Sequence, residues 1–273
     1  MFMSKPLDLS GRRVFITGAS AGLGQALAYR AAQEHRADIV AVARRRERLD
    51  ALKHDIESRY NVKVTPIVTD LTQVEAAQRA FDIAVADGPI HAAILNAGVT
   101  AYGRVLEHSK PSIDSILQTN VSTLVLLAQA FGKHMVANGD GGLMLVSSVA
   151  GFAPMPYQAV YGASKAFVTS YGLALRHELR GSGISVTVFA PGGMATEMLE
   201  LSGLSRKFKA DDVGIMSADQ CARIALQALI KRKGLSVPGP GNKLASLVMR
   251  LGPQPLVMHL IDRIYRGGLN PSA

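Results

Sequence analysis

The sequence predicts an α/β fold built on a doubly wound parallel sheet of about seven strands. Two observations support this: short β-branched runs alternate with longer helical patterns, and the short runs are continuously apolar. Continuously apolar strands are typical of a sheet covered by helices on both faces. Repeated strand–helix–strand units favour parallel order with right-handed crossovers. A chain of 273 residues is long enough for one such domain with a sizeable core.

The elements follow one another along the whole chain. The expected strands are RRVFITG (12–18), ADIVAVA (37–43), KVTPIVT (63–69), HAAILNAG (91–98), GLMLVSS (142–148), ISVTVFAP (184–191) and GLSVPG (234–239). Helical patterns occupy roughly 23–36, 45–60, 72–86, 112–137, 161–180 and 218–232. We expect residues 1–242 to form the main domain and 243–273 to form a helical extension of it. The spacing of apolar residues in this extension predicts two short amphipathic helices, separated by GPQP.

Composition narrows the functional classes. A content of 48% hydrophobic and 19% charged residues is typical of a soluble globular protein, and no apolar run is long enough to span a membrane. The N-terminal segment lacks an apolar signal region, and Cys221 is the only cysteine, so we expect a cytoplasmic protein. The net charge of +9 leaves a nucleic acid, an anionic membrane surface or a phosphorylated cofactor open. No nucleic-acid-binding signature is present, which disfavours the first of these.

A glycine-rich loop follows the first expected strand. In TGASAGLGQAL, Gly18, Gly22 and Gly24 precede a helix. Such a loop can turn sharply, and its backbone N–H groups can approach a pyrophosphate at the helix N-terminus. The position after the first strand of a strand–helix–strand unit predicts a dinucleotide site.

The end of the second strand bears on which dinucleotide is bound. Sites for NAD usually carry an acid there, which binds the ribose 2′-hydroxyl. This chain instead has Ala43 followed by Arg44, Arg45 and Arg46. A guanidinium can bind a 2′-phosphate through two hydrogen bonds, so NADP(H) is favoured over NAD(H). The alternative interpretation of Arg44 is a solvated helix start.

Four polar residues suggest an acid/base centre. Tyr161 and Lys165 are four positions apart on a predicted helix and therefore lie on one face. A tyrosine is a poor base near neutral pH unless a cation stabilises its phenolate, which Lys165 can do. Ser148 stands at a strand end, where its hydroxyl could orient a carbonyl. Asn120 falls inside a predicted helix, where it is either a surface or capping residue or a polar link to Lys165 through water.

Together, over roughly residues 10–196, these motifs resemble the classical short-chain dehydrogenase/reductase family. TGASAGLG looks like its cofactor loop, with Thr17 supporting it; VTDL and LNAG look like its adenine-side and central-sheet motifs, and PGGMAT like its Pro-Gly motif. The resemblance implies a catalytic tetrad of Asn120, Ser148, Tyr161 and Lys165, and no metal. The cofactor-binding residues that it implies, with the arginines above, are Gly18, Ser20, Ala21, Gly22, Leu23, Gly24, Arg44, Arg45, Asp70, Leu71, Asn96, Ala97, Gly98, Tyr161, Lys165, Pro191, Gly192, Met194 and Thr196.

The sequence departs from the family pattern at two points. Ala21 stands where some NADP-binding relatives have a basic residue, and the chain continues into a tail that many relatives lack. We expect hydride transfer between NADP(H) and a carbonyl or secondary alcohol, with a lipophilic small molecule as substrate. The side chains that suggest an apolar pocket are Met155, Pro156, Met198, Leu199, Leu201 and Leu204.

Partners and alternatives follow from the same features. The family resemblance implies a homodimer or homotetramer formed through the helices at 112–137 and 161–180. The apolar stripes of the tail must be buried at the pocket mouth, at a partner subunit or in a lipid surface, and we favour the first two. Two other functions stay open: a catalytically silent NADP(H)-binding regulator, and a membrane-surface protein that acts through its basic tail.

Overall fold

One parallel sheet of seven strands forms the centre of the protein. The structure, a computed structural model, describes residues 5–201 and 215–267. The strand order is β3-β2-β1-β4-β5-β6-β9, and every neighbouring pair is parallel. The strands are β1 (Arg13–Thr17), β2 (Asp38–Ala43), β3 (Val64–Val68), β4 (Ala92–Leu95), β5 (Gly141–Val146), β6 (Ile184–Phe189) and β9 (Leu235–Ser236). The predicted doubly wound sheet is confirmed, and all seven apolar runs contain a strand.

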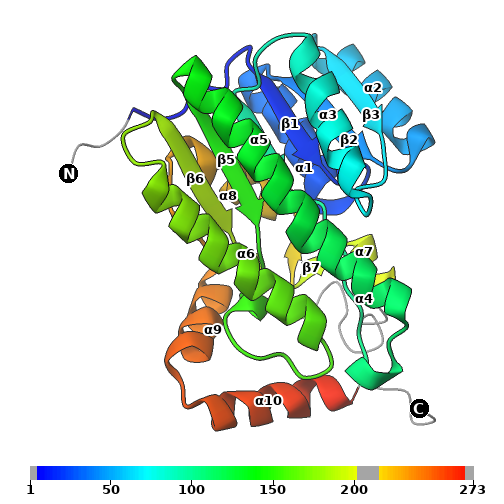
Figure 1. Cartoon of the computed structure of the whole chain (residues 1–273), viewed down its shortest axis with the longest axis vertical. Helices are drawn as coiled ribbons and strands as arrows, with labels where there is room; N and C mark the ends of the chain where they lie inside the picture. The colour runs from blue at the N-terminus through cyan, green and yellow to red at the C-terminus, as the bar shows by residue number, and fades with distance from the viewer. Residues whose placement is uncertain (1–4, 202–214, 268–273) are drawn as a thin grey trace.

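Helices cover both faces of this sheet (Figure 1). One layer consists of α1 (Gly22–His35), α2 (Arg46–Tyr60) and α8 (Ala218–Ile230), and the other of α3 (Val74–Ala86), α5 (Thr123–Asn138) and α6 (Ala159–Glu178). Beyond the carboxyl ends of the strands lie α4 (Lys110–Leu117), α7 (Glu197–Leu201), α9 (Pro240–Leu251) and α10 (Gln254–Arg266). These four helices therefore lie at the end of the molecule where the strands stop.

Two apolar cores, one on each face, hold the layers to the sheet. Successive side chains of a strand point to opposite faces. In β1, Val14 and Ile16 therefore join the core under α1, α2 and α8, whereas Phe15 joins the core under α3, α5 and α6. Phe15 packs against Phe131 of α5 with 4.5 Å between the ring centroids. Cys221 of α8 is fully buried in the first core, where it packs as a small apolar residue.

The chain reverses its direction of winding between β1 and β4. From β1 it proceeds outward to β2 and β3, then returns to place β4 on the other side of β1. At such a switch point the loops after neighbouring strands diverge and leave a crevice, where doubly wound sheets bind their ligands. The loops that follow β1 and β4 are TGASAGLG and NAG, the two motifs predicted to contact a cofactor.

The predicted helix at 112–137 is interrupted, which corrects the sequence-based expectation. A π-helical turn, Gln118–Ser122, separates α4 from α5. Turns of this kind insert one extra residue into a helix and are frequent at functional sites. Here the turn contains Asn120, which is completely buried. The interpretation of Asn120 as a surface residue is therefore wrong.

Two smaller features complete the carboxyl side. β7 (Met194–Ala195) pairs in parallel with β8 (Met216–Ser217) in a second sheet that the sequence did not predict, because two-residue strands leave no periodic pattern. The tail forms the two predicted helices, α9 and α10, with Pro253 in the turn between them. Each helix carries a proline in its first turn, where proline is tolerated. None of the described helices could cross a bilayer.

Two helical glycines give a matched test of how closely the layers approach the sheet. A Cβ at Gly172 of α6 would lie 2.5 Å from Val188 Cγ2, whereas one at Gly132 of α5 would meet only Leu143 Cδ1 at 3.9 Å. We expect Gly172→Ala to lower the free energy of unfolding by about 1–3 kcal/mol through overpacking. Gly132→Ala should raise it by about 0.5–1 kcal/mol, because alanine is the better helix former.

Urea denaturation of both variants beside the wild type measures these differences. Equal effects of the same sign would show that α6 has room to move away from the sheet.

Candidate active site

The glycine-rich loop turns from β1 into α1 without side chains in its way. Gly18 and Gly22 have positive φ angles of 70° and 54°, which favour glycine. A Cβ at Gly24 would lie 2.2 Å from the Gly18 carbonyl oxygen, so the loop and the first turn of α1 touch through their backbones. Ala21 precedes α1 in an extended conformation, and its side chain makes no cap. Leu23 is buried beneath the loop and anchors the helix start.

The loop after β4 is fixed directly to this glycine loop. The Thr17 hydroxyl accepts the backbone N–H groups of Asn96 and Ala97, each at 2.9 Å. In return the Asn96 amide donates to the Thr17 carbonyl at 2.9 Å. A Cβ at Gly18 would lie 2.9 Å from Asn96 Nδ2, so glycine is needed for this approach. The two motifs on either side of the switch point therefore form one rigid unit.

Lys165 brings its ammonium group to the end of β5. The side chain is 3% exposed, and Nζ donates to the Val146 carbonyl at 2.9 Å. The Ser147 hydroxyl holds the same turn of α6 by donating to the Lys165 carbonyl at 2.7 Å. Burial lowers the pKa of Lys165 to about 8. Burial without a carboxylate partner disfavours the charged form, so a moderate rise in pH removes this charge.

Asn120 is held by the backbone of the loop after β4. Its Oδ1 accepts the Val99 N–H and its Nδ2 donates to the Val99 carbonyl, both at 2.9 Å. Nδ2 also donates to the Ser164 hydroxyl at 3.0 Å, next to Lys165 in sequence. A Cβ at Gly98 would lie 3.3 Å from both Asn120 Oδ1 and Lys165 Nζ. These two polar atoms thus border the same space, and a link between them through water stays a prediction.

Ser148 and Tyr161 face each other from the end of β5 and the first turns of α6. The Ser148 hydroxyl accepts the Ala150 N–H at 3.2 Å and donates to the Pro191 carbonyl at 3.3 Å. Burial raises the pKa of Tyr161, and the Ser148 hydroxyl lowers it in part. Lys165 Nζ lies 5.7 Å from the centroid of the Tyr161 ring. We expected Lys165 to lower the tyrosine pKa, but in this structure the pKa of Tyr161 is raised, because burial outweighs the Ser148 hydrogen bond.

The Pro-Gly motif joins the two halves of the site. Val149 N–H donates to the Pro191 carbonyl at 2.9 Å, which ties the motif to the segment after Ser148. A Cβ at Gly22 would lie 3.1 Å from Thr196 Cγ2, so the same motif reaches the glycine loop. Gly192 meets Asn242 of α9, where a Cβ would lie 2.3 Å from Oδ1. Met194, in β7, is partly buried against the core under α1.

Of the two predicted arginines, Arg45 is the one that contacts the glycine loop. Its Nε and Nη2 donate to the Ser20 hydroxyl at 3.3 and 3.1 Å, and its Nη1 binds Glu197 at 2.8 Å. Glu197 also pairs with Arg48, and the two guanidinium groups lower the pKa of its carboxyl. Arg44 is exposed in the bend between β2 and α2. The sequence did not point to Glu197, which lies about 150 positions from both arginines.

The predicted adenine-side residues lie at the end of β3. Asp70 Oδ1 accepts the Thr72 N–H at 3.1 Å, which orients its carboxylate in a tight turn. Leu71 is buried in the core under α5, and its carbonyl accepts the Thr123 hydroxyl at 2.7 Å. The turn is therefore attached to α5 directly after the π-helical turn.

The C-terminal helix α10 packs against Tyr161. Val257 and Ile261 of α10 are buried in one small cluster with Ala150 and Met155, and Tyr161 packs against it. Tyr265 packs there too, and its pKa is raised to about 12, mainly by burial and in part by Tyr161. The tail therefore packs against the predicted acid/base residue, which agrees with one of the two favoured burial sites for its apolar stripes, the pocket mouth.

A polar contact fixes α10 over this cluster. The Tyr157 hydroxyl donates to Asp262 Oδ1 at 2.6 Å. Of the predicted pocket residues, Met155 is buried in the cluster, Pro156 is partly exposed and Met198 is 38% exposed. Leu204 lies outside the described residues, as do the side chains of Leu199 and Leu201.

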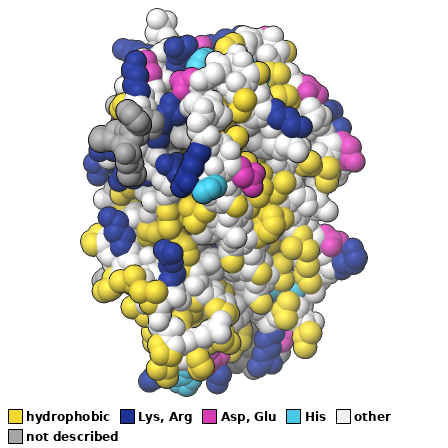
Figure 2. All heavy atoms as spheres, turned by 60° about the vertical axis from the view of Figure 1, so that its left-hand side comes forward, with side chains coloured by type: hydrophobic (Ala, Val, Ile, Leu, Met, Phe, Trp, Pro, Cys, Tyr) yellow, Lys and Arg dark blue, Asp and Glu magenta, His cyan; other side chains and the backbone are white. Residues whose placement is uncertain are grey.

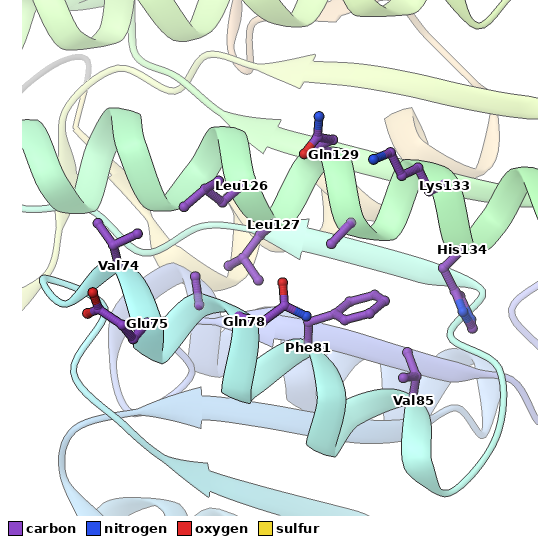
Figure 3. Close-up of a pocket in the computed structure, with 12 residues that line it drawn as sticks. Val74, Glu75, Gln78, Phe81, Val85, Leu126, Leu127, Gln129, Lys133 and His134 are labelled. Carbon is purple, nitrogen blue, oxygen red and sulfur yellow. The ribbon is translucent and has the colours of Figure 1, made fainter.

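A separate cavity of about 760 Å³ lies between α3 and α5 (Figure 3). Phe81 and Val85 from α3 face Leu127 and His134 from α5 across it. The described residues that line it include none of the predicted site residues. Volume alone does not make a reactive site, whereas the carboxyl ends of β4 and β5 bring several oriented polar side chains together. We therefore assign the chemistry to that end of the sheet.

Comparisons with known proteins identify the family of the chain. The family model described as short chain dehydrogenase matches residues 12–206. The chain is 37% identical over 187 residues to a sulfoacetaldehyde reductase from Chromohalobacter salexigens, covering 67% of this chain and 73% of that protein. It is 30% identical over 265 residues to the ketoacyl reductase HetN from Nostoc sp., covering 94% of this chain and 89% of that one.

The fold also matches a solved structure. A short-chain dehydrogenase from Sphingobium yanoikuyae in complex with NADPH superposes with a TM-score of 0.78 at 31% identity, covering 86% of this chain and 92% of that one. The family model covers more than half of the chain, and its matched region contains the glycine loop and the four predicted acid/base residues. The chain therefore belongs to the classical short-chain dehydrogenase/reductase family of oxidoreductases.

Proposed function

We propose that the protein is an NADP(H)-dependent enzyme that interconverts a carbonyl and a secondary alcohol, with Tyr161 as the acid/base group. The observation that carries this proposal is the meeting of Ser148, Tyr161 and Lys165 at the end of β5, beside the glycine loop. The intact set argues against a silent cofactor-binding regulator, because a regulator would not require an oriented proton donor.

The residues present fit a nicotinamide dinucleotide. The glycine loop would hold its pyrophosphate, and Asp70 would contact the adenine. Asn96 would steady the central sheet against the cofactor, and the nicotinamide would be flanked by Pro191, Gly192, Met194 and Thr196. Side chains at Gly22 or Gly98 would fill the space that this site leaves open. The bound cofactor supplies the hydride.

Each member of the tetrad has one task in this scheme. Tyr161 keeps its proton at neutral pH, because burial raises its pKa, and can donate it to a carbonyl oxygen. The Ser148 hydroxyl holds that oxygen within reach. Lys165 stabilises the tyrosinate that remains, and Asn120 keeps the loop after β4 in place beside the ammonium group.

Removal of the Tyr161 hydroxyl tests the central role. We expect Tyr161→Phe to lower kcat for ketone reduction by at least about 100-fold, because general acid catalysis contributes about 10²–10⁴-fold. NADPH affinity, measured by fluorescence titration, should change by less than about threefold, because the ring remains. Tyr171→Phe is the matched control and should keep wild-type kcat. Tyr171 lies on the same helix but packs against the core under α3, α5 and α6, away from the cluster at Tyr161. A Tyr161→Phe enzyme with a tenth of wild-type kcat would remove Tyr161 as the acid.

The pH profile tests the role of Lys165. The pKa of Lys165 is about 8, so its charge is present at neutral pH and is lost as the pH rises through that value. The pKa of Tyr161 is raised, so the tyrosine stays protonated over this range. We expect kcat/KM for NADPH, which reports the free enzyme, to fall above a pH of about 8. A profile that stays level to a pH of about 10 would show that this charge is not needed.

Cofactor preference is proposed to depend on the arginines after β2. Arg45 approaches the loop through Ser20, and Arg44 stands beside it at the surface. We expect NADPH to be preferred, and Arg44→Ala and Arg45→Ala each to narrow the ratio of kcat/KM for NADPH over NADH by about 10- to 100-fold. Arg48→Ala also breaks a pair with Glu197 but does not contact the loop, so it should leave the ratio unchanged. Equal use of both cofactors by the wild type would contradict the proposal.

The substrate is proposed to be a lipophilic ketone or alcohol. The walls beside Tyr161 are apolar, with Met155, Val257 and Ile261 in one cluster. A sulfonated or sugar-like substrate would need cationic or hydrogen-bonding side chains there. An activity screen over ketones of increasing chain length, with NADPH, identifies the class, and a preference for short polar carbonyls would overturn it.

The exposed side chains of α5 and α6 bear on the oligomeric state of the protein, and its cysteine content bears on its location in the cell. We propose a homodimer or homotetramer formed through α5 and α6, which expose Leu126, Phe167 and Leu173. Exposed large apolar side chains on two neighbouring helices are typical of subunit contacts. A single buried cysteine suits a cytoplasmic enzyme.

A further inference from the structure

Helix α9 carries its apolar stripe on the outside. Leu244, Leu247, Val248 and Leu251 recur at intervals of three and four, so they form one row, and they are 48–75% exposed. The buried residue of this helix is Ser246, and Asn242 on the same side bonds the Pro238 carbonyl. Met249 on the inner side packs against the cluster near Tyr161, but the leucine row on the outer side has no partner among the described residues.

Helix α10 carries two adjacent apolar rows. Val257 and Ile261 form the inner row, which packs near Tyr161. Leu256, Leu260 and Ile264 form an outer row, displaced by one position along the helix and 38–68% exposed. Only the inner row is used by the described fold. We call the exposed residues of both helices the α9–α10 apolar face: Leu244, Leu247, Val248, Leu251, Leu256, Leu260 and Ile264.

The charges around this face are nearly all positive. Between residues 240 and 267 the basic residues are Lys243, Arg250, Arg263 and Arg266, and the single acidic residue is Asp262. Asp262 is engaged by Tyr157 and by Arg266, so it does not leave a free negative charge there. In Figure 2 hydrophobic side chains crowd the lower end of the molecule, where α9 and α10 lie, with Lys and Arg side chains beside them.

We propose that the α9–α10 apolar face docks on the surface of an anionic lipid bilayer. Leucine-rich, basic amphipathic helices bury their apolar side at the boundary of headgroups and acyl chains, and the cations bind anionic headgroups. A second copy of the chain fits less well. A two-fold contact would bring the same basic patch of each subunit against its copy, and like charges repel.

In this docked arrangement the two apolar rows of α10 make different contacts. Its inner row covers the cluster at Tyr161 while its outer row contacts lipid. If the proposed function holds, the pocket would open close to the membrane surface, where lipophilic ketones concentrate. The docking itself does not depend on catalysis, so the two proposals can fail separately.

Vesicle flotation of the full-length protein tests the proposal. We expect binding to vesicles of phosphatidylcholine mixed with phosphatidylglycerol, and at least about tenfold weaker binding after Leu247→Glu with Leu251→Glu. Both side chains are more than half exposed, so the double variant should keep its NADPH binding and thermal midpoint. Ile83→Glu, at a 51% exposed position on α3 far from the tail, is the matched control and should bind like the wild type.

A variant that removes two positive charges separates recognition of anionic headgroups from non-specific hydrophobic adsorption. Lys243→Gln with Arg263→Gln should weaken binding to the anionic vesicles at least about tenfold, since each basic residue near the surface contributes about fivefold. Added salt should weaken wild-type binding in the same way. Absence of wild-type binding to anionic vesicles would overturn the proposal. A lower oligomer mass of the leucine variant, measured by light scattering, would identify the face as a subunit contact instead.

Discussion

The site depends on the burial of one ammonium group. Lys165 places its charge inside the protein with the Val146 carbonyl as its hydrogen-bond partner and, among the residues that the structure describes, no carboxylate beside it. Burying a charge is costly unless oriented dipoles replace water. Several local features serve this end. Gly98 leaves the space, the π-helical turn brings in Asn120, and the Ser147 hydroxyl holds the Lys165 backbone. The side chains of Asn120, Ser147 and Lys165 are therefore positioned together, through the same loops and the same turn of α6.

The two sides of the cofactor crevice are joined by backbone contacts more than by side chains. The glycine loop, the Asn96 loop and the Pro-Gly motif meet through the Thr17 hydroxyl and through glycines where a Cβ would collide. Close backbone contacts resist displacement because no rotamer can relieve them.

The sequence predicted the sheet well because each strand is a continuous apolar run, and the buried helices because their patterns are long. The tetrad and the glycine loop could be found because each motif follows a predicted strand or lies on a predicted helix. The π-helical turn could not be predicted, since its cause is a tertiary bond between Asn120 and Val99. The contact of Arg45, rather than Arg44, with the glycine loop also depends on tertiary partners, Ser20 and Glu197. The spacing of the tail predicted its helices but not which row would face inward.

The attachment of α10 has an evolutionary consequence. Its inner row touches the segment around Met155 and Tyr161, and the Tyr157–Asp262 hydrogen bond fixes it there, while the two sheet cores include none of its residues. Substitutions at Val257 or Ile261 can therefore alter the packing around Tyr161 without disturbing the packing that supports the glycine loop. The C-terminal helices are thus free to vary in sequence independently of the two sheet cores, which share no residue with them.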